Sequence, residues 1–338
     1  MKKIFVSGAN GHLGWNITEE LIKRGYKVKG SVTNINDASR VDRLTKAGVE
    51  VVEAHLEDRR SLEKAVQGCD AIMHVAAPFK MASGNPEKDI YEAAIAGTVN
   101  IMEAVKTAGI GKIVYTSSSG ALGSSGKNDP LKTENDYVKN PRLHYIRAKA
   151  DSENKFWEYA EKYKLNGVAT LPSTMLGPGF VRPTPSVQVF VDLYHGKLPA
   201  LPPFHFDYVD VRDVAKAHVD ILENNKAKGR YILNGKGYYV KEIAEMLRRD
   251  FPELKVPNLF LPEWMVPVAV AFDWIETKLT GKERLVTSDV IDEFGPGKLQ
   301  KYSSQKARDE LGWNPRPVEE SLRDMIAWIK TNFPKKKP

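Results

Sequence analysis

Cysteine is almost absent from this chain, since Cys69 is the single one among 338 residues. No disulfide can form within the chain, which fits a reducing compartment, and we expect Cys69 to fill a small space in the core. Long apolar runs are also missing. The most apolar stretch, Trp264 to Phe272, contains Pro267 and falls far short of the ~20 residues of a membrane helix. The sequence therefore predicts a cytoplasmic protein that does not insert into a membrane.

The chain also lacks low-complexity segments, internal repeats and any block of Lys and Arg interleaved with aromatic residues. A nucleic-acid partner is therefore not expected. Charged residues make up 28% of the chain and hydrophobic residues 42%, so extensive disorder is not expected either. The net charge of +7 favours anionic small ligands, although part of it comes from the terminal run Lys335–Lys337.

Strand and helix patterns alternate through the first half of the chain. This alternation predicts a parallel sheet with helices on both faces and with the carboxyl ends of its strands along one edge. Later strands are expected at 208–211 and 230–233, with a helix at 214–224 between them. The strand-like runs of the first half are 4–7, 26–32, 49–54, 71–75, 112–117 and 167–171, and its helical runs are 13–24, 59–67, 86–108 and 145–163.

A glycine-rich turn, Gly8-Ala-Asn-Gly11-His-Leu-Gly14, follows the first strand and opens the first helix. A helix N-terminus presents free N–H groups and about half a positive charge, which favours a phosphate. The glycines would permit a tight turn and close approach of the backbone to a pyrophosphate. The spacing G-x-x-G-x-x-G differs from the usual G-x-G-x-x-G, but its place behind a strand favours a dinucleotide cofactor.

Prolines and glycines interrupt the alternation after Leu171, and residues 236–330 carry mostly helical patterns. We therefore predict an α/β protein with a Rossmann-type doubly wound parallel sheet and a smaller, mostly helical C-terminal substrate domain. The dinucleotide-binding domain is expected at 1–171, with 207–234 returning to it. The substrate domain is expected at 172–206 and 235–338.

Tyr145 and Lys149 begin a helical run, and their spacing of four positions puts both side chains on one helix face. An ammonium beside a phenol favours the phenolate and would lower the phenol pKa from about 10. Tyr145 could then give a proton to a carbonyl oxygen, or take one in the reverse reaction. Ser118, at the end of a predicted strand, could donate to the same oxygen, with Ser117 and Ser119 as structural neighbours.

Tyr302 and Lys306 repeat the spacing of Tyr145 and Lys149, so the spacing alone does not identify a site. The two pairs differ in what precedes them. A predicted central strand that ends in serines comes before Tyr145, whereas no such strand comes before Tyr302. We therefore assign the chemistry to Tyr145 and predict that Tyr302 lies at the surface.

These motifs resemble those of the extended short-chain dehydrogenases/reductases of the NAD-dependent epimerase/dehydratase family, in particular the dihydroflavonol reductase and cinnamoyl-CoA reductase group. The resemblance implies an NAD(P)-dependent oxidoreductase with Ser118, Tyr145 and Lys149 as its catalytic residues. It also implies a possible homodimer built on helices such as 86–108 and 145–163. The matching pieces, in family order, are Gly8–Gly14, Gly68–Pro78, Gly97–Asn100, Val114–Ser118, Tyr145–Lys149, Gly177–Pro178, Tyr208–Ala215 and Gly229–Tyr231.

The resemblance further implies which residues hold the cofactor. Val32 stands where relatives that use the unphosphorylated cofactor carry an acidic residue, and Thr33 where reductases often carry a basic one. Absence of the carboxylate favours NADP over NAD, with Ser31, Thr33, Asn34 and Arg40 as donors. No metal is expected. The predicted cofactor-binding residues are Gly8, Asn10, Gly11, His12, Leu13, Gly14, Thr33, Arg40, His55, Leu56, Val75, Ala76, Ala77, Thr116, Tyr145, Lys149, Pro172, Ser173 and Thr174.

The predicted reaction is hydride transfer to a ketone or aldehyde of a mainly apolar small molecule, or from a secondary alcohol in reverse. One alternative is a sugar-nucleotide epimerase or dehydratase that retains its cofactor, in which Arg182 and Lys197 could grip a diphosphate. Another is a redox sensor without turnover. Candidate residues of the substrate pocket are Phe79, Met81, Phe180, Val181, Phe190, Tyr194, Phe204 and Phe206, although core packing is the simpler reading for Phe190 and Tyr194.

Overall fold

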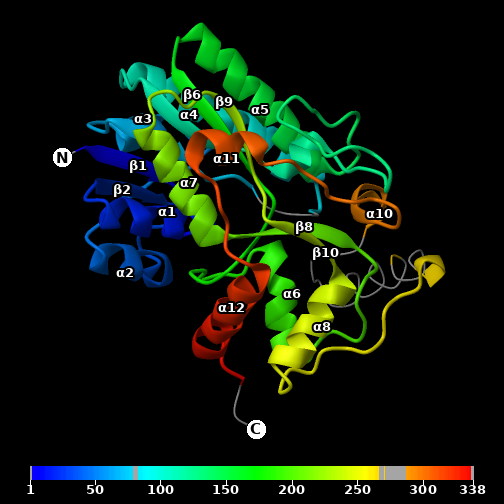
Figure 1. The fold of residues 1–338 in the computed structure, drawn as a ribbon. Helices are drawn as coiled ribbons and strands as arrows, with labels where there is room; N and C mark the ends of the chain where they lie inside the picture. Colours follow the sequence, from blue (N-terminus) through cyan, green and yellow to red (C-terminus); the bar gives the residue numbers. More distant parts are fainter. Residues whose placement is uncertain (1, 79–82, 266–269, 271–286, 336–338) are drawn as a thin grey trace.

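The computed structural model describes residues 2–78, 83–265, 270 and 287–335. A large sheet lies between two layers of helices, and a smaller unit built around α6, α8 and α12 lies beside it (Figure 1). The large sheet has seven parallel strands in the order β3-β2-β1-β4-β5-β6-β9. Its strands are β1 Lys3–Ser7, β2 Lys27–Val32, β3 Glu50–Glu53, β4 Ala71–His74, β5 Lys112–Thr116, β6 Asn166–Pro172 and β9 Gly229–Leu233.

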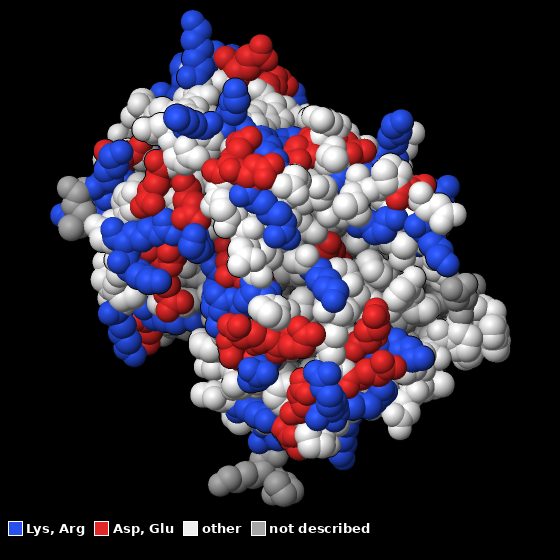
Figure 2. Space-filling model, viewed as in Figure 1, with Lys and Arg blue, Asp and Glu red and all other residues white. Residues whose placement is uncertain are grey.

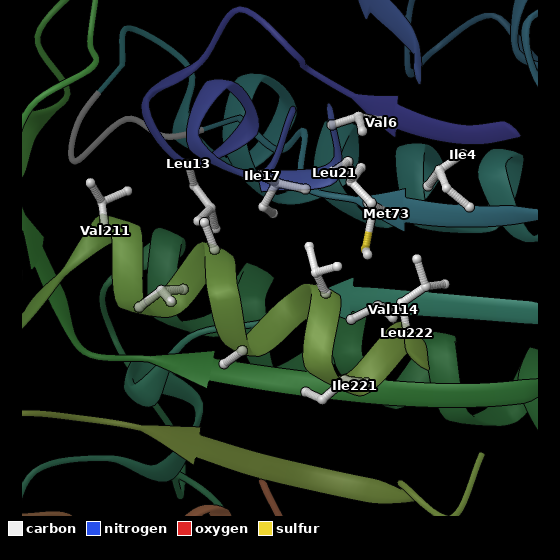
Figure 3. Close-up of a cluster of buried hydrophobic side chains, with 14 of the residues drawn as sticks. Ile4, Val6, Leu13, Ile17, Leu21, Met73, Val114, Val211, Ile221 and Leu222 are labelled. Atoms are coloured by element: carbon white, nitrogen blue, oxygen red, sulfur yellow. The ribbon is translucent and has the colours of Figure 1, made fainter. Parts of the chain in front are cut away.

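Both faces of this sheet are buried, which explains why its strands are short and apolar. Along β1, Ile4 and Val6 point to one core and Phe5 to the other, as the two-residue period of a strand requires. Helices α1 (His12–Lys23) and α7 (Val211–Glu223) cover the first face, and α3 (Arg59–Val66), α4 (Ala93–Thr107) and α5 (His144–Lys162) cover the second. Figure 3 shows the first core, where Ile4, Val6, Met73 and Val114 of the sheet face Leu13, Ile17 and Leu21 of α1 and Val211, Ile221 and Leu222 of α7.

The smaller unit contains a second sheet of three strands in the order β10-β8-β7, where β7 is Thr174–Leu176, β8 is His205–Asp210 and β10 is Lys236–Tyr239. Its core joins this sheet to three helices, namely α6 Pro185–Tyr194, α8 Val240–Asp250 and α12 Val318–Asn332. The C-terminal part also contains α10 Ser288–Phe294 and α11 Gln305–Leu311.

The predicted domain division needs one amendment. Although 235–338 was assigned as a whole to the substrate domain, α11 packs on β9 and α7 of the large unit. Ala307 and Trp313 share a core with Tyr231 of β9. After the return at 207–234, the segment that contains α11 and Trp313 therefore packs on the large unit again.

The predicted strands and helices are all present, within three residues at their ends. The helix expected at 86–108 begins with a π-helical segment, Glu87–Glu92, before α4. Helix α2 (Ala38–Lys46) was not predicted, because Val41 and Leu44 are its only large apolar residues and Leu44 alone is buried. The short strands β7 and β10 were also missed. Cys69 is buried, as expected for a core residue.

The prediction that Tyr302 lies at the surface is wrong. Its side chain is 5% exposed. The segment around it pairs with a distant loop through bridges between Ser125 and Leu299 and between Lys132 and Tyr302. Such long-range pairing has no local sequence signal, so the burial of Tyr302 could not be read from its neighbours.

Acidic and basic side chains are interspersed over the face shown in Figure 2, where neither sign forms a broad patch. Across the described ranges, no helix is both long enough and apolar enough to cross a membrane. Most of the apolar stretch from Trp264 to Phe272 lies outside those ranges. Among the described residues, no three His, Cys, Asp or Glu side chains lie together in a way that could hold a metal ion.

Two buried histidines brace the carboxyl ends of the central strands. The Ser7 hydroxyl accepts the backbone N–H groups of Val75 and Ala76, at 2.9 and 3.0 Å, and therefore donates to Nδ1 of His74 at 2.9 Å. This contact joins β1 to β4, where the strand order reverses and where ligands bind in such sheets. Burial lowers the pKa of His74 to about 3, so its ring is neutral.

His218 of α7 makes the equivalent contact to β5 and β6. Its Nδ1 donates to the Val214 carbonyl at 2.8 Å. Its Nε2 therefore accepts from the hydroxyls of Thr116 and Thr170, at 3.0 and 2.9 Å. Burial lowers the pKa of His218 to about 4. The ring is a neutral acceptor that holds two strand ends side by side.

We predict that acidification destabilises the fold before most carboxylates titrate. Burial holds the pKa values of His12, His74 and His218 at about 4, 3 and 4, so the unfolded chain binds up to three more protons below pH ~6.5. Asp207 opposes this by one proton, because burial raises its pKa to about 7. The net two protons lower the free energy of unfolding by about 3 kcal/mol per pH unit between roughly pH 6 and 5. Urea unfolding at several pH values measures this slope.

The matched variants are His218→Gln, which removes one buried ring, and His55→Gln, which removes a ring with a 49% exposed side chain. In His218→Gln the slope of the unfolding free energy against pH should fall by the equivalent of about one proton. In His55→Gln this slope should stay at the wild-type value. Equal slopes in all three proteins would contradict the assignment.

Candidate active site

A cavity of about 910 Å³ extends from the carboxyl ends of the large sheet into the smaller unit. It brings together nearly all of the predicted site residues, although they come from seven separate segments. Arg40 is the exception, because it does not belong to the lining. The predicted residues that line the cavity are Gly8, Asn10, Gly11, His12, Leu13, Gly14, Thr33, His55, Leu56, Val75, Ala76, Ala77, Thr116, Ser118, Tyr145, Lys149, Pro172, Ser173 and Thr174.

The glycine turn forms one wall of the cavity and fits a diphosphate. Gly8 has a φ of +67°, which disfavours other residues, and a Cβ at Gly14 would lie 2.1 Å from the Gly8 carbonyl oxygen. Gly11 is the N-cap of α1 and offers no side chain to its first N–H groups, and the first turn holds no acidic residue. This helix end therefore presents donors and positive potential to the cavity.

His12 fastens the glycine turn to the smaller unit. Its Nε2 lies 3.1 Å from the carbonyl oxygens of both Gly177 and Pro178, so this nitrogen carries the proton. Asn16 donates to the Pro178 carbonyl at 3.2 Å, and the Phe180 ring packs edge-on against the imidazole. The Gly177–Pro178 motif therefore supports the turn.

Polar and charged residues stand at the far end of β2. Val32 is buried, and Thr33 lines the cavity. Arg40 donates to the Thr33 hydroxyl and also, at 2.8 Å, to Asp37. Asp37 accepts a second guanidinium from Arg182 at 2.9 Å. Two arginines therefore stand just behind Thr33, joined by one partly buried carboxylate.

Ser118, Tyr145 and Lys149 meet near the middle of the cavity. Helix α5 carries Tyr145 and Lys149 one turn apart, and Ser118 follows β5. Ser118 hydrogen-bonds the Tyr145 phenol. Lys149 is buried and donates to the Thr116 carbonyl at 3.2 Å. A phenol, a hydroxyl and an ammonium thus converge on one region, as proton transfer to a substrate oxygen requires.

The expectation that Lys149 lowers the pKa of the Tyr145 phenol is not met. Burial raises this pKa to about 12, and the hydrogen bond from Ser118 offsets only part of that. Burial also lowers the pKa of Lys149 to about 8, although the Glu153 carboxylate acts in the opposite direction. At neutral pH the tyrosine is therefore a protonated donor beside an ammonium.

The three consecutive serines have different partners. Ser118 contacts the phenol of Tyr145, whereas Ser117 donates to Glu153 at 2.5 Å and Ser119 hydrogen-bonds Tyr302. Ser117 and Ser119 are buried, and Ser118 is partly exposed. The geometry therefore favours Ser118 as the serine that meets a substrate.

Glu153 was not anticipated from the sequence, although its position four residues after Lys149 could have indicated it. Its side chain is 1% exposed and pairs with Arg230 of β9 at 2.6 Å. It also accepts from the Trp157 indole at 3.1 Å and from Ser117. One carboxylate therefore ties α5 to the ends of β5 and β9.

Asp207 is a second buried carboxylate that sequence reasoning missed. It accepts from Asn234 at 2.9 Å and from Ser173, which lines the cavity, at 3.4 Å. Gln300, also in the lining, accepts the Asp207 backbone N–H at 3.4 Å. Burial raises the Asp207 pKa to about 7. This polar cluster holds the loop after β6 against β8.

The part of the cavity beyond Tyr145 is mainly apolar. Of the residues expected there, Phe190, Phe204 and Phe206 line it. Phe180, Val181 and Tyr194 lie outside the lining, and Phe79 and Met81 lie outside the described residues. Arg182 and Lys197 do not line it either, since they pair with Asp37 and Asp192. Among the lining residues that the structure describes, Lys149 is the sole Lys or Arg.

Comparison with known proteins identifies the family of this chain. Residues 4–234 match the NAD dependent epimerase/dehydratase family. Cinnamoyl-CoA reductase 1 of Arabidopsis thaliana is 31% identical over 324 residues, which cover 92% of this chain and 90% of the relative. The crystal structure of gox2253 superimposes with a TM-score of 0.84 at 30% identity, covering 99% and 100% of the two chains. The NADPH complex of the yeast methylglyoxal/isovaleraldehyde reductase Gre2 has the same fold, with a TM-score of 0.78 at 22% identity and coverage of 98% and 100%. The chain belongs to the NAD-dependent epimerase/dehydratase family and, within it, to the extended short-chain dehydrogenases/reductases, which are NAD(P)-dependent oxidoreductases.

Proposed function

We propose that this protein reduces a ketone or aldehyde of a mainly apolar small molecule with NADPH, and oxidises the corresponding alcohol in reverse. One observation supports this most. Ser118, Tyr145 and Lys149 meet where a cavity changes from a phosphate-binding glycine turn to an apolar interior. The proton donor therefore lies between the wall that would bind the cofactor and the space that would bind the substrate.

Three residues of this chain have separate roles at the carbonyl oxygen. NADPH held at the glycine turn would supply the hydride for the new C–H bond and would be left as NADP⁺. Tyr145 donates its proton to the carbonyl oxygen, and Ser118 donates a hydrogen bond that stabilises the developing negative charge. The Lys149 ammonium then stabilises the phenolate that Tyr145 becomes. The raised pKa of Tyr145, about 12, suits this direction because the phenol starts protonated.

The charge of the cavity argues against a sugar-nucleotide epimerase or dehydratase. Such an enzyme must bind a second diphosphate, which calls for Arg or Lys near the substrate. In the described part of the lining, the one side chain of this kind is Lys149, which already contacts the Thr116 carbonyl. The two classes also differ in outcome, because a reductase consumes NADPH and an epimerase returns its cofactor unchanged.

We predict that Tyr145→Phe lowers kcat/KM by at least a hundredfold for any carbonyl that the wild-type enzyme reduces, because general acid catalysis is worth about 10²–10⁴. The fall in NADPH absorbance with a panel of apolar ketones and aldehydes measures this. The affinity for NADPH should stay within about threefold of wild type. Tyr159→Phe, on the same helix but outside the cavity lining, is the matched control. Turnover in Tyr145→Phe within tenfold of that control would remove Tyr145 from the mechanism.

A preference for NADPH over NADH is supported by Thr33, Arg40 and the lack of an acidic residue at Val32. A 2′-phosphate near Thr33 would lie within reach of a guanidinium that already contacts this hydroxyl. We predict that Arg40→Ala weakens NADPH binding by roughly tenfold and leaves NADH binding unchanged.

Dissociation constants from nucleotide fluorescence measure this without turnover. Arg60→Ala, an exposed arginine on α3, serves as the control for a general loss of positive charge. An equal loss of affinity for both nucleotides in Arg40→Ala, or no loss at all, would refute the role of Arg40.

A further inference from the structure

The apolar part of the cavity has two sections that differ in character. The section around Tyr145 is walled by a cluster that includes Phe204, Phe206 and Phe294. Phe206 lies edge-on to Phe204 at a centroid distance of 6.0 Å and is tilted toward Phe294 at 5.7 Å. This outer section therefore places three Phe rings beside the phenol of Tyr145, and Ile146, Val290 and Ile291 complete its wall.

A second section lies deeper, inside the core of the smaller unit. We call it the inner chamber, and six aliphatic residues define it: Val189 and Leu193 of α6, Leu198, and Ile243, Ala244 and Leu247 of α8. All six belong to, or pack against, the core that joins α6, α8 and α12. Phe206 and Val240 pack against both this core and the cluster around Tyr145, so they mark the passage between the sections.

The position of the inner chamber is unusual for a folded core. The facing sides of α6 and α8 would normally pack against each other, because unfilled apolar space costs stability. Here residues of both helices line the cavity as well as belonging to the surrounding core. The nearest polar pair on α6, Gln188 and Asp192, is satisfied internally by a hydrogen bond of 3.1 Å. The space is therefore suited to a hydrocarbon rather than to a charged group.

We propose that the inner chamber holds the aliphatic tail of the substrate, so that the preferred substrates are ketones or aldehydes carrying a long alkyl chain. This inference rests on the proposed function, since Tyr145 must be where the carbonyl lies. The chain would leave the carbonyl beside Tyr145, pass Phe206 and Val240, and end between α6 and α8. Branched aliphatic side chains make up most of the inner wall and favour such a flexible chain. Besides Phe206, the aromatic residues of this core that line the cavity are Phe190 and Tyr208.

A series of methyl ketones from 2-butanone to 2-dodecanone tests the proposal. In the wild-type enzyme kcat/KM should rise about two- to fourfold per added methylene and then level off when the chamber is full. Ala244→Leu narrows the chamber and should move the plateau to shorter chains. Leu247→Ala widens it and should move the plateau to longer chains. Leu222→Ala, in the other core on α7, should leave the plateau where it is.

The outcomes separate this inference from the proposed function. Two results would contradict the proposal for the inner chamber and leave the proposed reductase function standing. One is turnover that is independent of chain length, and the other is a plateau that neither Ala244→Leu nor Leu247→Ala moves. The rise in melting temperature with 1-alkanols of four to twelve carbons gives a readout without turnover. Stabilisation that grows with chain length and is lost in Ala244→Leu supports the chamber, even if no carbonyl compound consumes NADPH and the proposed function fails.

Discussion

A buried carboxylate holds the site together. Glu153 sits on α5 two turns beyond Tyr145 and one turn beyond Lys149, and it binds both Ser117 after β5 and Arg230 on β9. Breaking such a buried pair by removing one partner typically costs about 3–5 kcal/mol, so this attachment is far firmer than any surface ion pair. It sets the position of α5 along the strand ends, and with it the meeting of Tyr145, Lys149 and the serine beside Ser117.

The same strand ends are also held by two neutral histidines, His218 from the opposite face and His74 from the face that α5 covers. His218 bridges Thr116 and Thr170, and His74 bridges to Ser7 where the strand order reverses. Backbone groups fix each tautomer. The Val214 carbonyl can only accept from His218, and the two backbone N–H groups that the Ser7 hydroxyl accepts leave this hydroxyl to donate to His74. These contacts fix the edge of the sheet at which the glycine turn, Tyr145 and Lys149 line the cavity.

Much of the fold and of the site could be predicted because the signals are local. Short apolar strands alternate with amphipathic helices, and the glycine turn and the Tyr145–Lys149 spacing each lie within one element. What was missed depends on contacts between distant segments. Tyr302 is buried by pairing with the loop near Lys132, and Asp207 and Glu153 acquire their roles from partners on other strands. The pKa of Tyr145 was predicted in the wrong direction because burial, which spacing does not reveal, raises it and outweighs the hydrogen bond from Ser118.

The central claim is that Tyr145 and Lys149 act as one unit, in which the ammonium must be charged when the phenol gives up its proton. The most direct test is the pH dependence of kcat/KM for NADPH-dependent reduction between pH 6 and 10. Since burial lowers the Lys149 pKa to about 8, the rate should be level below that pH and fall about tenfold per pH unit above it as the ammonium is lost. A rate that stays level to pH 10 would contradict the account.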